Sequence, residues 1–135
     1  MLVCLRGILE TGEPLAIGVP TDTRTTLSIP AVSSATVRVY ITTPTGEPVD
    51  LVRISATAKM AVRQTPSNVV PFIELTGTAS PGKPRGYVDF SITALSTKYA
   101  TPGRYTYTVW LLTSTSIDVV IPASPFNLLP ATLLR

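Results

Sequence analysis

The stretch TPGRYTYTVWLLT, residues 101–113, decides the fold class of this chain. Its side chains alternate with a period of two after the turn-forming pair Pro102-Gly103. The residues of one row are Tyr105, Tyr107, Val109 and Leu111, and those of the other are Thr106, Thr108, Trp110 and Leu112. Because both rows are largely apolar or aromatic, we predict a β-strand covered on both faces, at the centre of its sheet.

The same period recurs on both sides of this strand. In residues 36–42, Val37, Val39 and Ile41 share one face, which is typical of a half-buried antiparallel strand. Residues 54–62 also alternate, although their Ala, Lys and Met would suit a helix. Pro71 indicates that the apolar residues 69–76 form an edge strand or a bend. The other expected elements are strands at 3–9, 15–19, 25–29 and 86–93, a loop at 78–86, a helical turn at 94–100, a hairpin partner at 117–121, a break at 122–125 and a last strand at 126–129.

Length and composition agree with an all-β domain. The chain has 135 residues, and its 21 Thr, 14 Val and 9 Ile make about a third of it β-branched. Short strands at regular spacing predict an immunoglobulin-like antiparallel β-sandwich of seven to nine strands with extended termini. We place an N-terminal arm or extra strands in residues 1–24 and the sandwich, ending in an apolar tail, in residues 25–135.

The residue types that the chain contains and lacks argue against several classes of catalytic and binding site. The chain contains no His, and its single cysteine, Cys4, has no partner for an internal disulfide. Of its eight acidic residues, Glu13, Glu47 and Asp50 fall in turn-like segments, and Glu74 and Asp89 fall on outward strand positions. Its eleven basic residues are scattered along the sequence, and the net charge is only +3. We therefore expect no enzyme, no cofactor or metal, no small-molecule substrate and no nucleic-acid partner. No apolar run is long enough for a membrane span or a signal peptide, so we expect synthesis in a cytoplasm and no membrane partner.

Aromatic side chains are the remaining candidates for ligand binding. Trp110 and the five tyrosines, Tyr40, Tyr87, Tyr99, Tyr105 and Tyr107, could form a platform on which sugars stack. However, Tyr105 and Trp110 differ in strand parity and so point to opposite faces of their strand. Packing in the core is the favoured interpretation for Trp110.

Residues 101–107 resemble the start of the F strand of immunoglobulin-like domains, whose pattern is D-x-G/A-x-Y-x-C. Thr101 stands in the place of the acid and Tyr107 in that of the cysteine. The resemblance implies that Tyr105 is a corner tyrosine, whose hydroxyl bonds back to the backbone. It gives Gly103, Tyr105 and Tyr107, with Trp110, structural roles.

The order of four segments carries a narrower resemblance. They are ATVRVYITTPTGEPVDL (35–51), GYVDFSIT (86–93), TPGRYTYTVWLL (101–112) and VVIPASPFNLLPA (119–131). Residues 25–131 resemble the immunoglobulin-like N-terminal domain of upper baseplate proteins of tailed bacteriophages and related small virion domains. This implies a non-enzymatic structural protein of the phage tail, baseplate or another appendage. It would be made in the host cytoplasm, reside in the virion and assemble with copies of itself and other virion proteins.

The C-terminal segment is the expected contact between subunits. Its apolar side chains are Phe126, Leu128, Leu129, Leu133 and Leu134, and Pro125 and Pro130 should keep them out of a long regular strand. The alternative is that this segment completes the domain's own sheets. For function, the alternative to assembly is a carbohydrate- or receptor-binding β-sandwich module.

Overall fold

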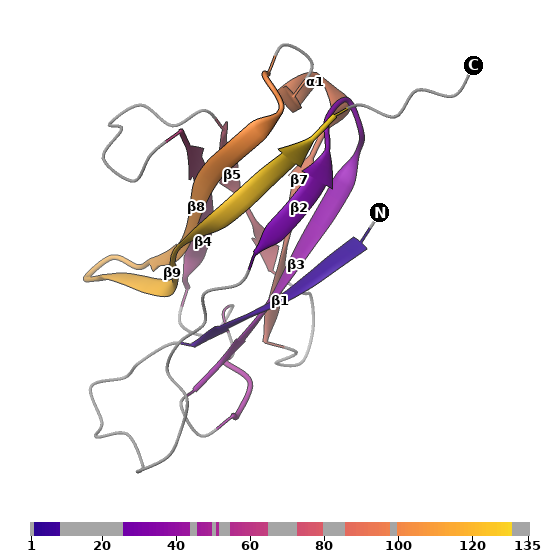
Figure 1. Cartoon of the computed structure of the whole chain (residues 1–135). Coiled ribbons are helices and arrows are strands. Elements are labelled where there is room, and N and C mark those ends of the chain that lie inside the picture. Colours follow the sequence, from indigo (N-terminus) through magenta and orange to yellow (C-terminus); the bar gives the residue numbers. More distant parts are fainter. Residues whose placement is uncertain are drawn as a thin grey trace.

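The computed structural model describes residues 2–8, 26–43, 46–49, 51, 55–64, 73–79, 86–97 and 100–130. These residues form two facing β-sheets, which confirms the predicted β-sandwich (Figure 1). One sheet has the order β1-β3-β7-β6 and the other the order β2-β9-β8-β4-β5. The elements are β1 (Leu2–Ile8), β2 (Leu27–Pro30), β3 (Ala35–Thr42), β4 (Thr57–Arg63), β5 (Ile73–Thr76), β6 (Thr78–Ala79), β7 (Tyr87–Ile92), α1 (Ala94–Thr97), β8 (Gly103–Leu112) and β9 (Ile117–Leu129).

The inner rows of the strands make the core, as their alternation predicts. Val37, Val39 and Ile41 of β3 are fully buried, and β8 lies in the middle of the five-stranded sheet. The largest fully buried side chains are Tyr107, Phe90 and Phe126. No helix in the described ranges is long and apolar enough to cross a membrane.

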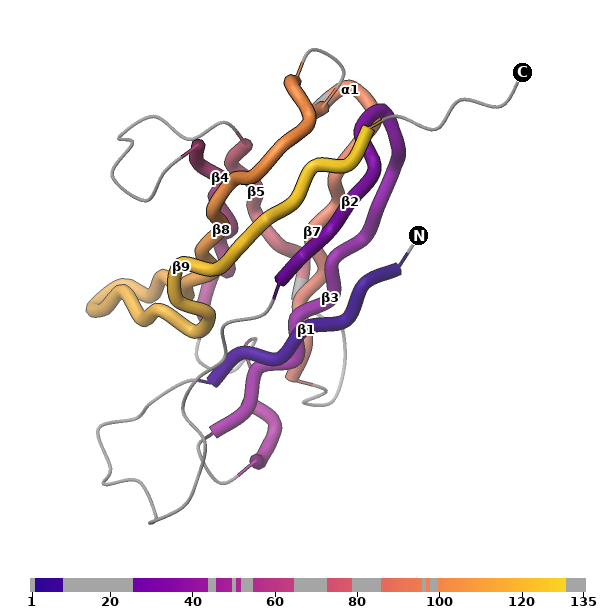
Figure 2. The backbone as a smooth tube through the Cα atoms, viewed as in Figure 1, coloured from indigo at the N-terminus to yellow at the C-terminus, as the bar shows by residue number. Residues whose placement is uncertain are grey.

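Two strand pairs run parallel, so the prediction of an antiparallel sandwich is wrong for them. β1 pairs with β3 and β2 pairs with β9 in parallel, while the other pairs of named strands are antiparallel. Figure 2 shows the chain adding β1 at the side of β3 and then β2 at the side of β9. Side-chain alternation assigns faces to a strand but leaves its direction open, because both directions bury the same row.

The last strand is longer than the sequence predicts. β9 runs from Ile117 to Leu129 through Pro122 and Pro125, where a break was expected. Pro122 is tolerated because the ladder is irregular there: Tyr107 and Val109 of β8 pair with Ser124 and Ile121, which leaves an extra residue on β9. Pro125 pairs in register with Thr106 of β8, at a position where β2 does not pair with the other side of β9. Residues 126–129 therefore belong to the sandwich.

The segment after β5 is a second departure. Residues 78–86 were expected to be a loop, but Thr78 and Ala79 form β6 at the edge of the opposite sheet. The chain changes sheets at Gly77, where an added Cβ would overlap the side chain of Val88. Only glycine fits this close passage.

Candidate functional site

A tyrosine corner fixes the start of β8, as the sequence motif implies. The hydroxyl of Tyr105 donates a hydrogen bond of 2.6 Å to the carbonyl of Thr101. Gly103 begins the strand between them and lies opposite Leu128 of β9. The ring of Tyr105 also meets Phe126 edge-on, with the centroids 6.4 Å apart. This corner stabilises the fold and presents no reactive group.

Tyr107 takes the place of the motif's cysteine in the centre of the core. Its side chain is fully buried, and the residue opposite it on β9 is Ser124. Burial raises the pKa of Tyr107 to about 12, although the hydrogen bond with Ser124 acts in the opposite direction. The phenol therefore stays neutral at ordinary pH, and its role is packing.

The predicted C-terminal interface is wrong for two of its residues. Phe126 and Leu128 are buried within the chain's own core, at 0% and 2% exposure, because residues 126–128 pair with both β2 and β8. Leu129 is 42% exposed. Leu133 and Leu134 lie outside the described residues.

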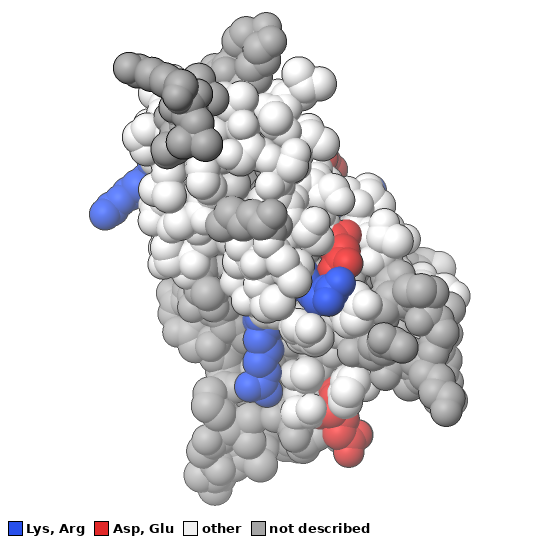
Figure 3. Space-filling view, turned by 90° about the vertical axis from the view of Figure 1, so that its right-hand side faces the viewer, with Lys and Arg blue, Asp and Glu red and all other residues white. Residues whose placement is uncertain are grey.

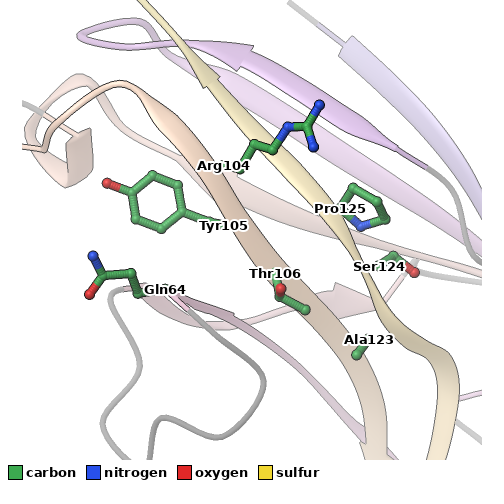
Figure 4. Close-up of a pocket in the computed structure, with 7 residues that line it drawn as sticks. All are labelled: Gln64, Arg104, Tyr105, Thr106, Ala123, Ser124 and Pro125. Carbon is green, nitrogen blue, oxygen red and sulfur yellow. The ribbon is translucent and has the colours of Figure 1, made fainter.

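A shallow pocket opens on the five-stranded sheet beside the tyrosine corner (Figure 4). Its lining residues are Gln64, Arg104, Tyr105, Thr106, Ala123, Ser124 and Pro125. The hydroxyl of Ser124 already donates to the carbonyl of Pro122 at 2.6 Å. The lining of this pocket contains no carboxylate beside Arg104 that could act as a general acid or base.

A charged and aromatic cluster lies on the outer face of the other sheet. Arg38 of β3 donates from Nε and an Nη to the two carboxylate oxygens of Asp89 on β7, at 2.8 and 3.1 Å. Its guanidinium also stacks 4.2 Å from the ring centroid of Tyr87, and Tyr87 lies 5.6 Å from Tyr40. Figure 3 shows few charged side chains on the side of the molecule that it presents.

The charged groups of this cluster bind one another within the chain. The hydrogen bond to Asp89, followed by that to Tyr40, raises the pKa of Arg38 even further above its usual value. The rings of Tyr40 and Tyr87 are inclined at 60°, and one side of Tyr87 is occupied by Arg38. Stacked sugars need an open, flat aromatic surface, and this pair does not present one. Tyr99 lies outside the described residues.

The outer face of the β8–β9 hairpin brings several exposed apolar side chains together. Leu112, Ile117 and Val119 are 38%, 68% and 54% exposed. Leu112 is opposite Ile117, and Val119 is opposite Trp110, so the four side chains form one patch, which we call the hairpin face. Figure 2 shows the hairpin turn reaching outward from the two sheets.

The position of Trp110 corrects the core-packing prediction. Trp110 is only half-buried and lies on the outer row of β8, away from Tyr107 and Val109. Alternation showed correctly that the outer row is apolar, but it does not reveal whether another element covers that row. No described element does. The apolar outer row of residues 110–119 is therefore the sequence feature that indicates the hairpin face, although the same pattern also fits a strand buried on both faces.

The described residues contain no group of three or more His, Cys, Asp or Glu side chains that could hold a metal ion. Cys4 is a free, exposed thiol on β1.

No family model matches the chain, and no curated protein matches it. One solved structure similar to it is the N-terminal domain of ORF48 of phage TP901-1. The two chains are 12% identical, with 98% of this chain and 100% of that one covered, and the TM-score is 0.48.

Proposed function

We propose that this chain is a non-enzymatic structural protein of a tailed-bacteriophage virion, a component of the tail, baseplate or another appendage. It acts by assembling with copies of itself and with other virion proteins. The observation that carries the proposal is the hairpin face, where Trp110, Leu112, Ile117 and Val119 present one apolar surface to solvent. The sequence resemblance to phage baseplate domains supplies the biological setting.

The physical reason is the cost of leaving this face in water. Monomeric soluble proteins seldom expose contiguous large apolar side chains, and such patches usually mark contacts with other proteins. Each buried aliphatic side chain contributes on the order of 1.5–3 kcal/mol before the cost of ordering the partners is subtracted. Trp110 is also of the residue type that dominates interface energetics.

The test replaces Ile117 and Val119 together by lysine. Both side chains are more than half exposed, so the sandwich should keep its melting temperature. In a phage that lacks its own copy, the parent chain supplied in trans should enter particles and the double variant should not. Leu95→Gln is the matched control, because Leu95 is 76% exposed on α1. Equal incorporation of the double variant and the parent would refute the role of the hairpin face.

The alternative of a carbohydrate-binding module predicts a different result. The parent chain would then bind on a glycan array, and Tyr87→Ala would abolish the signal. We expect no glycan signal, because Arg38 covers one side of the Tyr87 ring.

A further inference from the structure

β1 is the longest regular open edge in the described part of the sandwich. It pairs with β3 over all seven residues without a register shift, and no described strand pairs with its other side. The other edges are short or irregular: β2 and β5 have four residues each and β6 has two. The part of β9 that β2 does not pair with contains a bulge at Pro122 and a second proline, Pro125. An open edge presents unpaired N–H and C=O groups that bind another strand, and natural proteins usually blunt such edges. β1 contains no proline and one charged residue, Arg6.

The part of β1 that is open to a partner is short and well defined. Burial alternates from Leu2 to Arg6, with Leu2, Cys4 and Arg6 exposed, whereas Gly7 and Ile8 are both buried. At Gly7 the sheets are already in contact, since an added Cβ would lie 3.1 Å from Cβ of Val120. A partner strand can therefore extend along Leu2–Arg6, whose midpoint is Cys4.

We propose that β1 pairs antiparallel with β1 of a second copy of this chain, across a two-fold axis at Cys4. The pairing rests on the proposed function and adds to it the partner of one surface, the open edge of β1. A two-fold axis perpendicular to the sheet keeps outer rows together and sets Cys4 opposite Cys4 of the second copy. The two four-stranded sheets then become one continuous intermolecular sheet.

Charge and packing agree with this register. Arg6 lies opposite Leu2 of the second copy, so no like charges face each other. On the inner row, Val3 lies opposite Leu5 of the second copy. Val3 is only partly buried and already packs against the core, so the pairing covers its remaining surface.

A charge at the two-fold axis tests the pairing. Cys4→Asp sets two carboxylates opposite each other, while Cys4→Ser keeps the site neutral and is the matched control. Sedimentation velocity should give twice the chain mass for the parent and Cys4→Ser, and the single mass for Cys4→Asp. A single mass for the parent at its highest soluble concentration, or a Cys4→Asp dimer as stable as that of Cys4→Ser, would overturn the proposal.

Cross-linking tests the register without relying on the Asp variant. Cα atoms of opposite residues in an antiparallel pair lie about 4.5–5.5 Å apart, within the range of disulfides. In a Cys4→Ser background, chains with Leu2→Cys and chains with Arg6→Cys should form disulfide-linked dimers when mixed and oxidised with copper phenanthroline in air. Neither should do so alone. A mixture that cross-links no faster than its components contradicts the register.

The two proposals fail in different ways. A monomeric chain that still enters particles refutes the β1 pairing and leaves the virion role intact. A chain that dimerises through β1 but is absent from particles refutes the virion role.

Discussion

Replacing Phe126 by alanine distinguishes a core residue from an interface residue. Phe126 is fully buried, and its ring meets those of Tyr105 and Tyr107 edge-on, each at 6.4 Å between centroids. Removing a buried phenylalanine side chain costs about 3–5 kcal/mol, because the surrounding core only partly closes over the cavity. A domain of this size has a free energy of unfolding of about 5–15 kcal/mol, so the loss is a large share of it.

The assay is urea unfolding followed by circular dichroism, with thermal melts in parallel. Phe126→Ala should lower the urea midpoint at an unchanged slope and reduce the melting temperature by about 10–20 °C. Leu129→Ala, three residues away at 42% exposure, is the control and should cost less than about 1 kcal/mol. If Phe126→Ala were as stable as Leu129→Ala, the placement of Phe126 in the core would be wrong.

Three further results are expected. The pKa of Tyr107 is about 10 in the unfolded chain and about 12 in the fold. This group should therefore leave the free energy of unfolding unchanged below pH 10 and lower it by about 1.4 kcal/mol per pH unit between pH 10 and 12. Tyr107→Phe should make that decline shallower in urea unfolding at alkaline pH. Tyr105→Phe removes the bond to Thr101 and should cost about 0.5–1.5 kcal/mol in the same unfolding assay, whereas an unchanged midpoint would show that the corner is idle. A double-mutant cycle of Arg38→Met and Asp89→Asn should give a coupling that weakens as NaCl is added, since both side chains are 28% exposed; a salt-independent coupling would contradict an exposed ion pair.

The sequence predicted the features that depend on local pattern. Alternation identified the buried faces of β3, β7 and β8, because a residue's neighbours two positions away share its face. The motif at residues 101–107 located the corner tyrosine, since the hydroxyl of Tyr105 and the carbonyl of Thr101 are only four residues apart.

The missed features depend on contacts between distant segments. The parallel pairing of β1 with β3 joins residues more than thirty positions apart, and nothing local encodes that direction. Pro122 and Pro125 suggested a break, but a bulge in the ladder with β8 accommodates Pro122, and Pro125 lies where β2 does not pair with β9. The strand therefore continues and places Phe126 and Leu128 in the core. The outer row containing Trp110 looked as apolar as the inner row, so its exposure could be recognised only from the arrangement of the sheets.

The central claim is that this chain is a structural part of a phage particle. Its most direct test is quantitative mass spectrometry of purified particles of the phage that encodes it, beside the lysate of the infected cells. We predict that the chain is present in particles at a fixed copy number relative to the major tail protein, preparation after preparation. A chain that is abundant in the lysate but absent from purified particles would contradict the claim.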